Sequence, residues 1–208
     1  IAANLSGSAA DLAAAFAGSV TTHTGTVTAT DATTVAQANI FDAASNGVVT
    51  ATISSTATLL ATLTGSTGAY TLTISGATAA TLAELVAINA ATTGAITLNA
   101  QTIAANLSGS AADLAAAFDG TVTTHTGTVT ISGATAATLA ELVAINAATT
   151  GAITLNAQTI AANLSGSAAD LAAAFAGTVT THTGTVTATG ATTVAQANIF
   201  DAASNGVV

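Results

Sequence analysis

Three histidines are the residues whose chemistry would first suggest a functional site in this chain. His23, His125 and His182 lie in near-copies of one stretch, which reads TVTTHTGTVT at 121–130. An imidazole can bind a metal ion or titrate near neutral pH, so equivalent rings in stacked repeats would form a ladder. None of the three has a second His, a Cys or an acid within a few residues. A metal or pH-sensing ladder is therefore disfavoured, and a turn is the preferred interpretation.

The spacing of the valines around the second histidine predicts where its imidazole lies. Val122 and Val129 are seven residues apart, so one unbroken strand would point them to opposite faces. A corner at 124–127, with Gly127 at positive φ, returns both valines to the inward face. We therefore expect His125 at a bend and at least partly exposed.

Nine carboxylates form the second candidate group, and the spacing of five of them predicts helix caps. Each of the five follows a serine or threonine by three residues. This is the spacing of the capping box, in which the acid accepts a hydrogen bond from the backbone N–H of the cap. The pairs are Ser8 with Asp11, Ser110 with Asp113, Ser167 with Asp170, Thr81 with Glu84, and Thr138 with Glu141.

The other four acids show no metal-binding pattern. Asp31 is replaced by Gly190 in a second copy of its module, and both residue types are accepted at an N-cap. Asp119 is replaced by alanine in its sister copies, and Asp42 and Asp201 have no assigned role. Neither the EF-hand spacing nor the glycine–aspartate nonapeptide of calcium-binding β-rolls is present. Calcium binding by carboxylates gathered through stacking is the weaker alternative, and no catalytic, cofactor-binding or metal-ligating residue is predicted.

Composition excludes several classes of partner. The chain has no Lys or Arg and a formal charge of −9, so it lacks the cations that bind nucleic acid or anionic lipid surfaces. The mean hydropathy is +0.70, but Thr, Gly or Asn breaks every apolar run well before the ~18–20 residues of a membrane-spanning helix. The sequence contains no nucleophile elbow, phosphate loop or paired-carboxylate arrangement. We therefore expect neither an enzyme nor a binder of a small-molecule substrate.

Threonine arrays are the remaining candidate surface. Thr24, Thr26, Thr28 and Thr30 alternate with other residues, which on a strand places their hydroxyls ~7 Å apart on one face. Flat arrays of this kind resemble the ice-binding face of some β-solenoid antifreeze proteins. The plainer interpretation is that threonine suits a solvent-facing strand.

The chain as a whole is a mosaic of copied modules. Residues 1–28 recur at 103–130 and 160–187 with changes only at the positions of Ala17 and Ser19. Residues 74–102 recur unchanged at 131–159, and 29–49 recur at 188–208 with Asp31 replaced by Gly190. The modules are 1–28, 29–53, 54–73, 74–102, 103–130, 131–159, 160–187 and 188–208. Both ends fall inside strand-like stretches, so we expect a window of a longer array.

Each module carries one helix pattern and one or two strand patterns. In TLAELVAINAA, Leu82, Leu85, Val86 and Asn89 share one helical face, whereas GAITLN alternates as a strand does. Eight helix starts, which give units averaging 26 residues, are expected near Ser8, Ala32, Ser55, Thr78, Ser110, Thr135, Ser167 and Thr192. This period lies within that of leucine-rich-type repeats. We expect an α/β solenoid of about eight stacked helix–strand units with a parallel sheet on one side; the alternative is an all-β solenoid in which SAADLAAAF is extended.

Stretches such as TISGATAATLAELVAINAATTGAITL resemble the Ala/Thr/Gly-rich repeats of giant surface proteins of marine cyanobacteria and other aquatic bacteria. The resemblance covers essentially the whole chain, implies an extracellular or cell-surface location and a structural role, and carries over no functional residue. We therefore expect a non-enzymatic repeat protein that needs no cofactor. It would form a stiff rod, filament or surface-layer element by rung stacking and self-association. An adhesin or ice-binding array that uses the Thr-rich strand faces is the alternative.

Overall fold

The computed structural model describes residues 2–18, 22–65 and 68–208. Ile1, Ser19 with the two residues after it, and 66–67 lie outside these ranges, so the sequence difference at Ser19 has no structural account. The chain divides into two compact units. One comprises Ile1–Thr102 with Gly120–Thr123, and the other comprises Ile103–Asp119 with Thr124–Val208.

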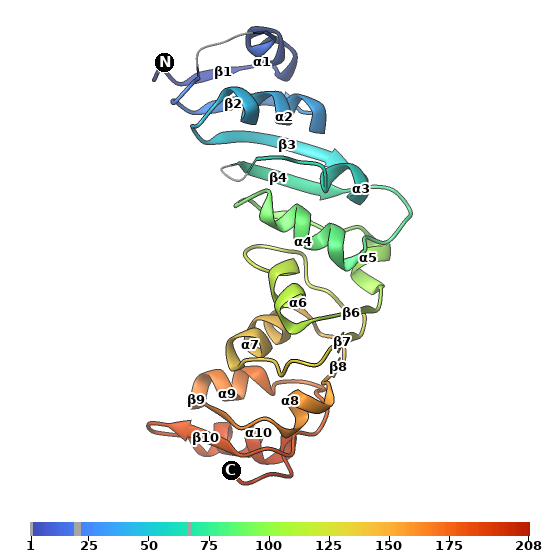
Figure 1. Ribbon diagram of the computed structural model, residues 1–208, viewed down its shortest axis with the longest axis vertical. Coiled ribbons are helices and arrows are strands. Elements are labelled where there is room, and N and C mark those ends of the chain that lie inside the picture. Colours follow the sequence, from blue (N-terminus) through green and yellow to red (C-terminus); the bar gives the residue numbers. More distant parts are fainter. Residues whose placement is uncertain (1, 19–21, 66–67) are drawn as a thin grey trace. The chain divides into compact units, whose positions relative to one another are not determined.

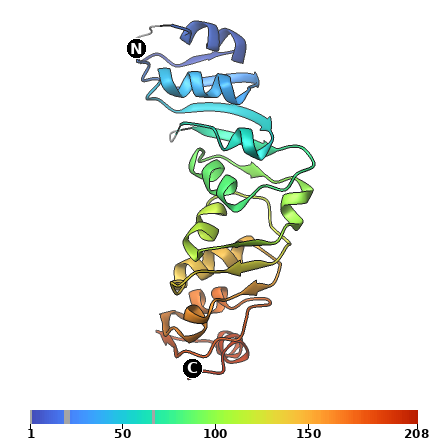
Figure 2. The same cartoon turned by 45° about the vertical axis from the view of Figure 1, so that its right-hand side comes forward.

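In the first unit, helices alternate with the strands of one parallel sheet (Figure 1). The elements are β1 (Leu5–Gly7), α1 (Ala9–Phe16), β2 (Val27–Ala32), α2 (Val35–Ala44), β3 (Val49–Ser55), α3 (Ala57–Leu60), β4 (Ala69–Ile74), α4 (Leu82–Ala90), β5 (Ile96–Thr97) and α5 (Ala100–Ala104). The sheet order follows the chain, β1-β2-β3-β4-β5, and every described pairing in it is parallel. Helices α1 and α2 lie side by side in both views (Figures 1 and 2).

The second unit repeats this alternation. Its elements are β6 (Leu107–Gly109), α6 (Ala111–Ala117), β7 (Val129–Ile131), α7 (Leu139–Ala148), β8 (Ile153–Thr154), α8 (Ala157–Ala161), β9 (Leu164–Ser167), α9 (Ala168–Ala174), β10 (Val186–Thr189) and α10 (Val194–Ala203). The strands form two parallel sheets, β6-β7-β8 and β9-β10. Helix α7 packs against α6 and α9, and α10 packs against α9.

The predicted α/β class with parallel strand pairing is confirmed. The all-β alternative is wrong, because the three copies of SAADLAAAF form α1, α6 and α9, as their alanine content favours. The structure has three sheets rather than the single sheet predicted, because some neighbouring segments pair through only one residue each and do not form strands. Ile96 pairs with Val122, and Ile153 with Val179, through isolated parallel bridges.

Helix starts depend on which hydroxyl accepts the third N–H of the helix. Starts at Ser8, Ser110 and Ser167 are confirmed as N-caps. The other starts lie one to three residues later than predicted, because a downstream threonine makes the capping bond. The observed caps are Thr34 rather than Ala32, Thr56 rather than Ser55, Thr81 rather than Thr78, Thr138 rather than Thr135, and Thr193 rather than Thr192.

The stretch AQTIA forms a short helix in both copies, although no helix start was predicted near it. Asn99 accepts a hydrogen bond from the N–H of Thr102 at 2.9 Å, and Asn156 accepts the equivalent bond from Thr159 and caps α8. Asparagine is a strong N-cap residue, and alanine and glutamine favour helix. The asparagine and the helix propensity of these residues therefore start a helix that the predicted starts do not include.

The core consists of one inward row of side chains from the strands and one face of each helix. Of the face predicted for α4, Leu85 is buried but Leu82, Val86 and Asn89 are only half-buried, and Ile88 completes the buried face instead. All five phenylalanines of the chain are buried and supply its largest apolar side chains together with Tyr70. Among the described residues, no helix is both long and apolar enough to cross a membrane.

Candidate functional site

The three histidine corners are buried, which corrects the prediction of partial exposure. His23, His125 and His182 are 2%, 0% and 0% exposed. Each ring faces a phenylalanine of the preceding helix segment, as Phe118 does at a centroid distance of 5.5 Å from His125. The prediction failed because the valine phase located the bend correctly but gave no information on the direction of the side chain.

Backbone and side-chain bonds both hold the second corner in place. The N–H of His125 donates to the carbonyl of Ala148, and the N–H of Thr150 donates to the carbonyl of His125, both at 2.9 Å. The Nε2 atom lies 2.8 Å from the carbonyl oxygen of Ala105 and must donate, because a carbonyl only accepts. The Nδ1 atom lies 3.3 Å from Oγ1 of Thr149. Both ring nitrogens of His125 therefore lie against polar atoms of neighbouring segments.

Burial favours the neutral form of the His125 and His182 rings. It lowers the pKa of His125, and the carbonyl of Ala105 offsets only part of that shift. Burial also lowers the pKa of His182, and the nearby carbonyl of Ala162 is the main opposing influence. Neither ring nitrogen of His182 makes a hydrogen bond of normal geometry, so proximity to that carbonyl does not amount to a bond. A neutral, enclosed imidazole of this kind is a packing residue and has no access to substrate or metal.

Glycine is required at the corner for close packing, and not for the positive φ that was predicted. Gly127 does not have a positive φ, whereas Gly120 and Gly133 on either side do. A Cβ on Gly127 would lie 2.0 Å from the carbonyl oxygen of Ala105, and one on Gly151 would lie 1.8 Å from that of Gly127. Equivalent contacts are made by Gly25, Gly47, Gly94, Gly184 and Gly206. Successive segments can thus approach closely because each of these glycines lies against a backbone carbonyl of the preceding segment.

A hydroxyl accompanies most of these glycines. Ser45, Thr149 and Ser204 pair by parallel bridges with His23, His125 and His182 respectively. Each hydroxyl then accepts a hydrogen bond from the N–H of the glycine two residues later, at 2.9–3.0 Å. Thr92 makes the same bond to Gly94. The same arrangement therefore recurs between segments: a buried Ser or Thr bonds the N–H of a glycine two residues later, and that glycine lies against a carbonyl of the preceding segment. We call this arrangement the hydroxyl–glycine contact.

All five predicted serine and threonine N-caps are present, but the predicted bond from the backbone N–H of the cap to the acid is present in only two of the pairs. Glu84 and Glu141 complete capping boxes, because each accepts from the backbone N–H of its capping threonine at 2.8 and 2.7 Å. In the three Ser–Asp pairs the aspartate side chain, which is shorter than that of glutamate, instead accepts a hydrogen bond from the serine hydroxyl at 2.7 Å. Thr34 with Gln37, and Thr193 with Gln196, form two further capping boxes that were not predicted.

Asp31 does not cap its own helix, contrary to the interpretation of the Asp31–Gly190 exchange. Its Oδ1 accepts a hydrogen bond from the N–H of Ala9 at 2.6 Å, so it caps α1 in the neighbouring segment. Gly190 has a φ of +99° and cannot make this contact. The exchange therefore replaces an inter-segment hydrogen bond with a left-handed turn.

Asp42 and Tyr70 form a buried pair that the sequence did not suggest. The phenol of Tyr70, which is 0% exposed, donates to Oδ2 of Asp42, while Oδ1 is buried without a described partner. Burial raises the pKa of Asp42, and the Tyr70 bond opposes that shift. Asp201, the equivalent residue in the second copy, is exposed, as is Asp119. No group of three or more His, Cys, Asp or Glu that could hold a metal occurs among the described residues.

Of the predicted threonine array, only Thr28 and Thr30 lie in a strand, β2, where Thr28 is half-buried and Thr30 is exposed. Other hydroxyl side chains form rows across neighbouring strands. In the first unit, Thr28 pairs with Thr50, Thr52 with Thr71, and Thr73 with Thr97, so hydroxyls of neighbouring strands are in register. Similar rows occur in the second unit, where Ser108, Thr130 and Thr154 are in register. We call these rows the hydroxyl lanes.

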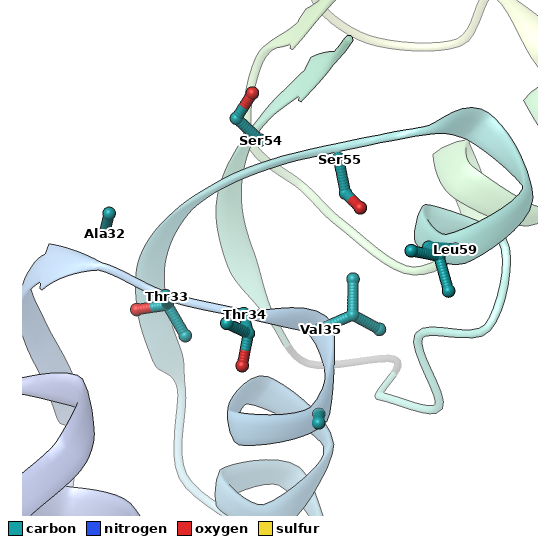
Figure 3. A pocket seen from close by; sticks show the side chains of 8 residues that line it. Ala32, Thr33, Thr34, Val35, Ser54, Ser55 and Leu59 are labelled. Carbon is teal, nitrogen blue, oxygen red and sulfur yellow. The ribbon is translucent and has the colours of Figure 1, made fainter. Parts of the chain in front are cut away.

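A pocket of about 420 Å³ lies between the β2–α2 and β3–α3 junctions (Figure 3). It is lined by Ala32, Thr33, Thr34, Val35, Ala36, Ser54, Ser55 and Leu59. A second pocket, of about 430 Å³, includes Glu84, whose two carboxylate oxygens already accept bonds from Thr58 and Thr81. The first lining contains no titratable side chain, and in the second the carboxylate of Glu84 is engaged by the cap of α4 and by Thr58.

In comparisons with known proteins, no family model, curated protein or solved structure matches the chain.

Proposed function

We propose that this chain is a non-enzymatic structural repeat protein of the cell surface, whose helix–strand units stack as an α/β solenoid. The stack would form a stiff rod, filament or surface-layer element and would associate with neighbouring repeats or further copies. The observation that carries the proposal is the hydroxyl–glycine contact. It recurs with the same residue types in both units, as expected where one segment is the template for the next.

The chemistry of the surface supports the same role. The carboxylates whose contacts are described serve helix ends or inter-segment bonds, and the imidazoles serve the core. The absence of Lys and Arg leaves no site for trypsin-type proteases. These features suit a stable exposed scaffold, and none of them provides a reacting group.

Electron microscopy of native material tests the proposal. We expect rods, filaments or an ordered layer labelled by an antibody against this chain, and particles without extended order would contradict it. Catalytic turnover that disappears in a His125→Ala variant would also contradict it, because a packing residue in a scaffold has no reaction to lose.

The hydroxyl lanes favour a second candidate, an adhesive or ice-binding array. In-register hydroxyls on neighbouring parallel strands, such as Thr52 and Thr71, give a regular two-dimensional pattern. Partitioning of the chain into slowly growing ice measures this function. Enrichment in ice that is lost when Thr52 and Thr71 are both replaced by lysine would support the second candidate over a purely structural role.

A further inference from the structure

The tripeptide Asn-Leu-Ser lies at the start of three strands. It lies at Asn4, Asn106 and Asn163, directly before or at the start of β1, β6 and β9. Asparagine followed by any residue except proline and then Ser or Thr is the acceptor sequence for asparagine-linked glycans. The tripeptide alone is a weak signal, so its geometry decides whether the site is usable.

The strand places both recognised side chains in solvent. Residues two apart on a strand point to the same face, and Asn106 and Ser108 are both exposed while Leu107 between them is 5% exposed. The third copy has the same arrangement, with Leu164 also 5% exposed. In the first copy Asn4 and Ser6 are likewise exposed. The buried leucine anchors the site in the second and third copies, whereas Leu5 in the first copy is itself 36% exposed. In all three copies the asparagine and the serine are exposed.

One hydrogen bond orients the asparagine amide in each copy. The Oδ1 atoms of Asn4, Asn106 and Asn163 accept from the backbone N–H of Thr26, Thr128 and Thr185 at 3.0, 3.2 and 3.0 Å. Nδ2 of these three residues donates to no described residue. The oxygen is thus held by the neighbouring segment, and the nitrogen, which is the atom that receives a sugar, belongs to an exposed side chain.

Four asparagines outside this tripeptide use the same nitrogen differently. Nδ2 donates to backbone carbonyls at 2.7–3.0 Å in Asn39, Asn99, Asn146 and Asn156. Glycosylation of those nitrogens would break internal bonds, whereas a sugar on the three tripeptide asparagines would break none.

We propose that Asn4, Asn106 and Asn163 are acceptor sites for N-linked glycans. In the transfer, Nδ2 attacks the anomeric carbon of a sugar held on a phosphate donor. The C–N bond forms as the bond from carbon to phosphate oxygen breaks, the phosphate leaves with the electron pair, and Nδ2 loses one proton. The transferase and the donor belong to the host cell, and the chain supplies only the acceptor. The inference goes beyond the proposed function, because a scaffold needs no sugar.

Mass spectrometry of the chain isolated from its own cells tests this. The absence of Lys and Arg rules out trypsin, so a protease that cleaves after small aliphatic residues is used. We expect sugar on all three tripeptide asparagines and none on Asn46 or Asn205, which are exposed but precede Gly-Val. The mass added per site distinguishes a preassembled oligosaccharide from a lipid donor and a single sugar from a nucleotide donor.

Replacement of the serine provides the matched variant. Ser6→Ala, Ser108→Ala and Ser165→Ala destroy the acceptor sequence but leave each asparagine and its hydrogen bond in place. In the same cells these variants should lose the added mass completely at the altered site while their melting temperatures, measured on enzymatically deglycosylated protein, stay unchanged. A native chain whose mass equals that of the bare polypeptide, or sugar carried by Ser or Thr hydroxyls instead, would overturn the proposal.

Discussion

Replacing Gly151 with alanine should open the contact between two segments of the second unit. The new Cβ would lie 1.8 Å from the carbonyl oxygen of Gly127, and Cβ atoms essentially never approach other atoms closer than 3.0 Å. The carbonyl must therefore move by more than 1 Å. The flanking bonds from Thr150 to the carbonyl of His125 and from Val129 to that of Ala152, both 2.9 Å long, cannot survive such a shift.

The cost follows from those two bonds. A backbone group left buried without its partner costs about 1–3 kcal/mol, so we expect Gly151→Ala to lower the free energy of unfolding by about 4 kcal/mol. Gly133→Ala is the matched control, because Gly133 has a φ of +96° but no atom within 4 Å of the point where the alanine methyl group would lie. Its cost is the left-handed strain alone, about 1–2 kcal/mol.

Urea denaturation followed by far-ultraviolet circular dichroism measures both variants. Gly151→Ala should unfold at clearly lower urea concentration than Gly133→Ala. An equal or smaller loss for Gly151→Ala would refute the explanation, since it would show that the segments do not rely on glycine for their approach.

Other perturbations test the polar contacts. Tyr70→Phe leaves the Asp42 carboxylate half-buried without its donor and should cost about 1–3 kcal/mol at neutral pH, read from the urea midpoint. Because the folded-state pKa of Asp42 is raised above its ordinary value of 3.8, its contribution is full below that pH and is lost as the pH rises through the folded-state pKa. Asp42→Asn should therefore gain thermal stability over the wild type as the pH rises, whereas Asp201→Asn, at the exposed equivalent, should not. The pKa of His125 is lowered from 6.5, so stability is full above that pH and is lost as the pH falls below it; His125→Gln should flatten this part of a melting-temperature profile. Asp31→Ala should lower stability by about 1 kcal/mol through loss of the cap on α1, and Asp31→Asn, which keeps an acceptor oxygen, should lose less in the same urea assay.

Local patterns predicted the fold class well, because they act over a few residues. The Ser-Ala-Ala-Asp spacing placed the starts of α1, α6 and α9 correctly, since an N-cap and the third helical N–H are close in sequence. The alternation in GAITLN placed β5 and β8. Both patterns depend on residues that are neighbours along the chain.

Contacts between segments could not be predicted in this way. Asp31 binds the N–H of Ala9, 22 residues away, and Tyr70 meets Asp42 across 28 residues. Only the stacking register brings such residues together, and the register follows from the packing of the whole unit. The burial of His125 has the same origin, because Thr149 of the next segment covers one side of its ring.

The hydroxyl–glycine contact has a consequence for how such a gene can change. Ser45 and Ser204 follow copies of the same helix, whereas Thr149 follows a helix of different sequence and lies 24 residues after its histidine, yet each meets a histidine corner in the same way. The histidine corner lies within one module, and the Ser/Thr-x-Gly sequence that packs on it lies within the next. Recombination that moves or duplicates a module therefore also moves the residues that make its contacts. Unequal crossing-over between copies would then change the length of the array without disturbing its packing, which accounts for sister modules that recur at irregular intervals along the chain.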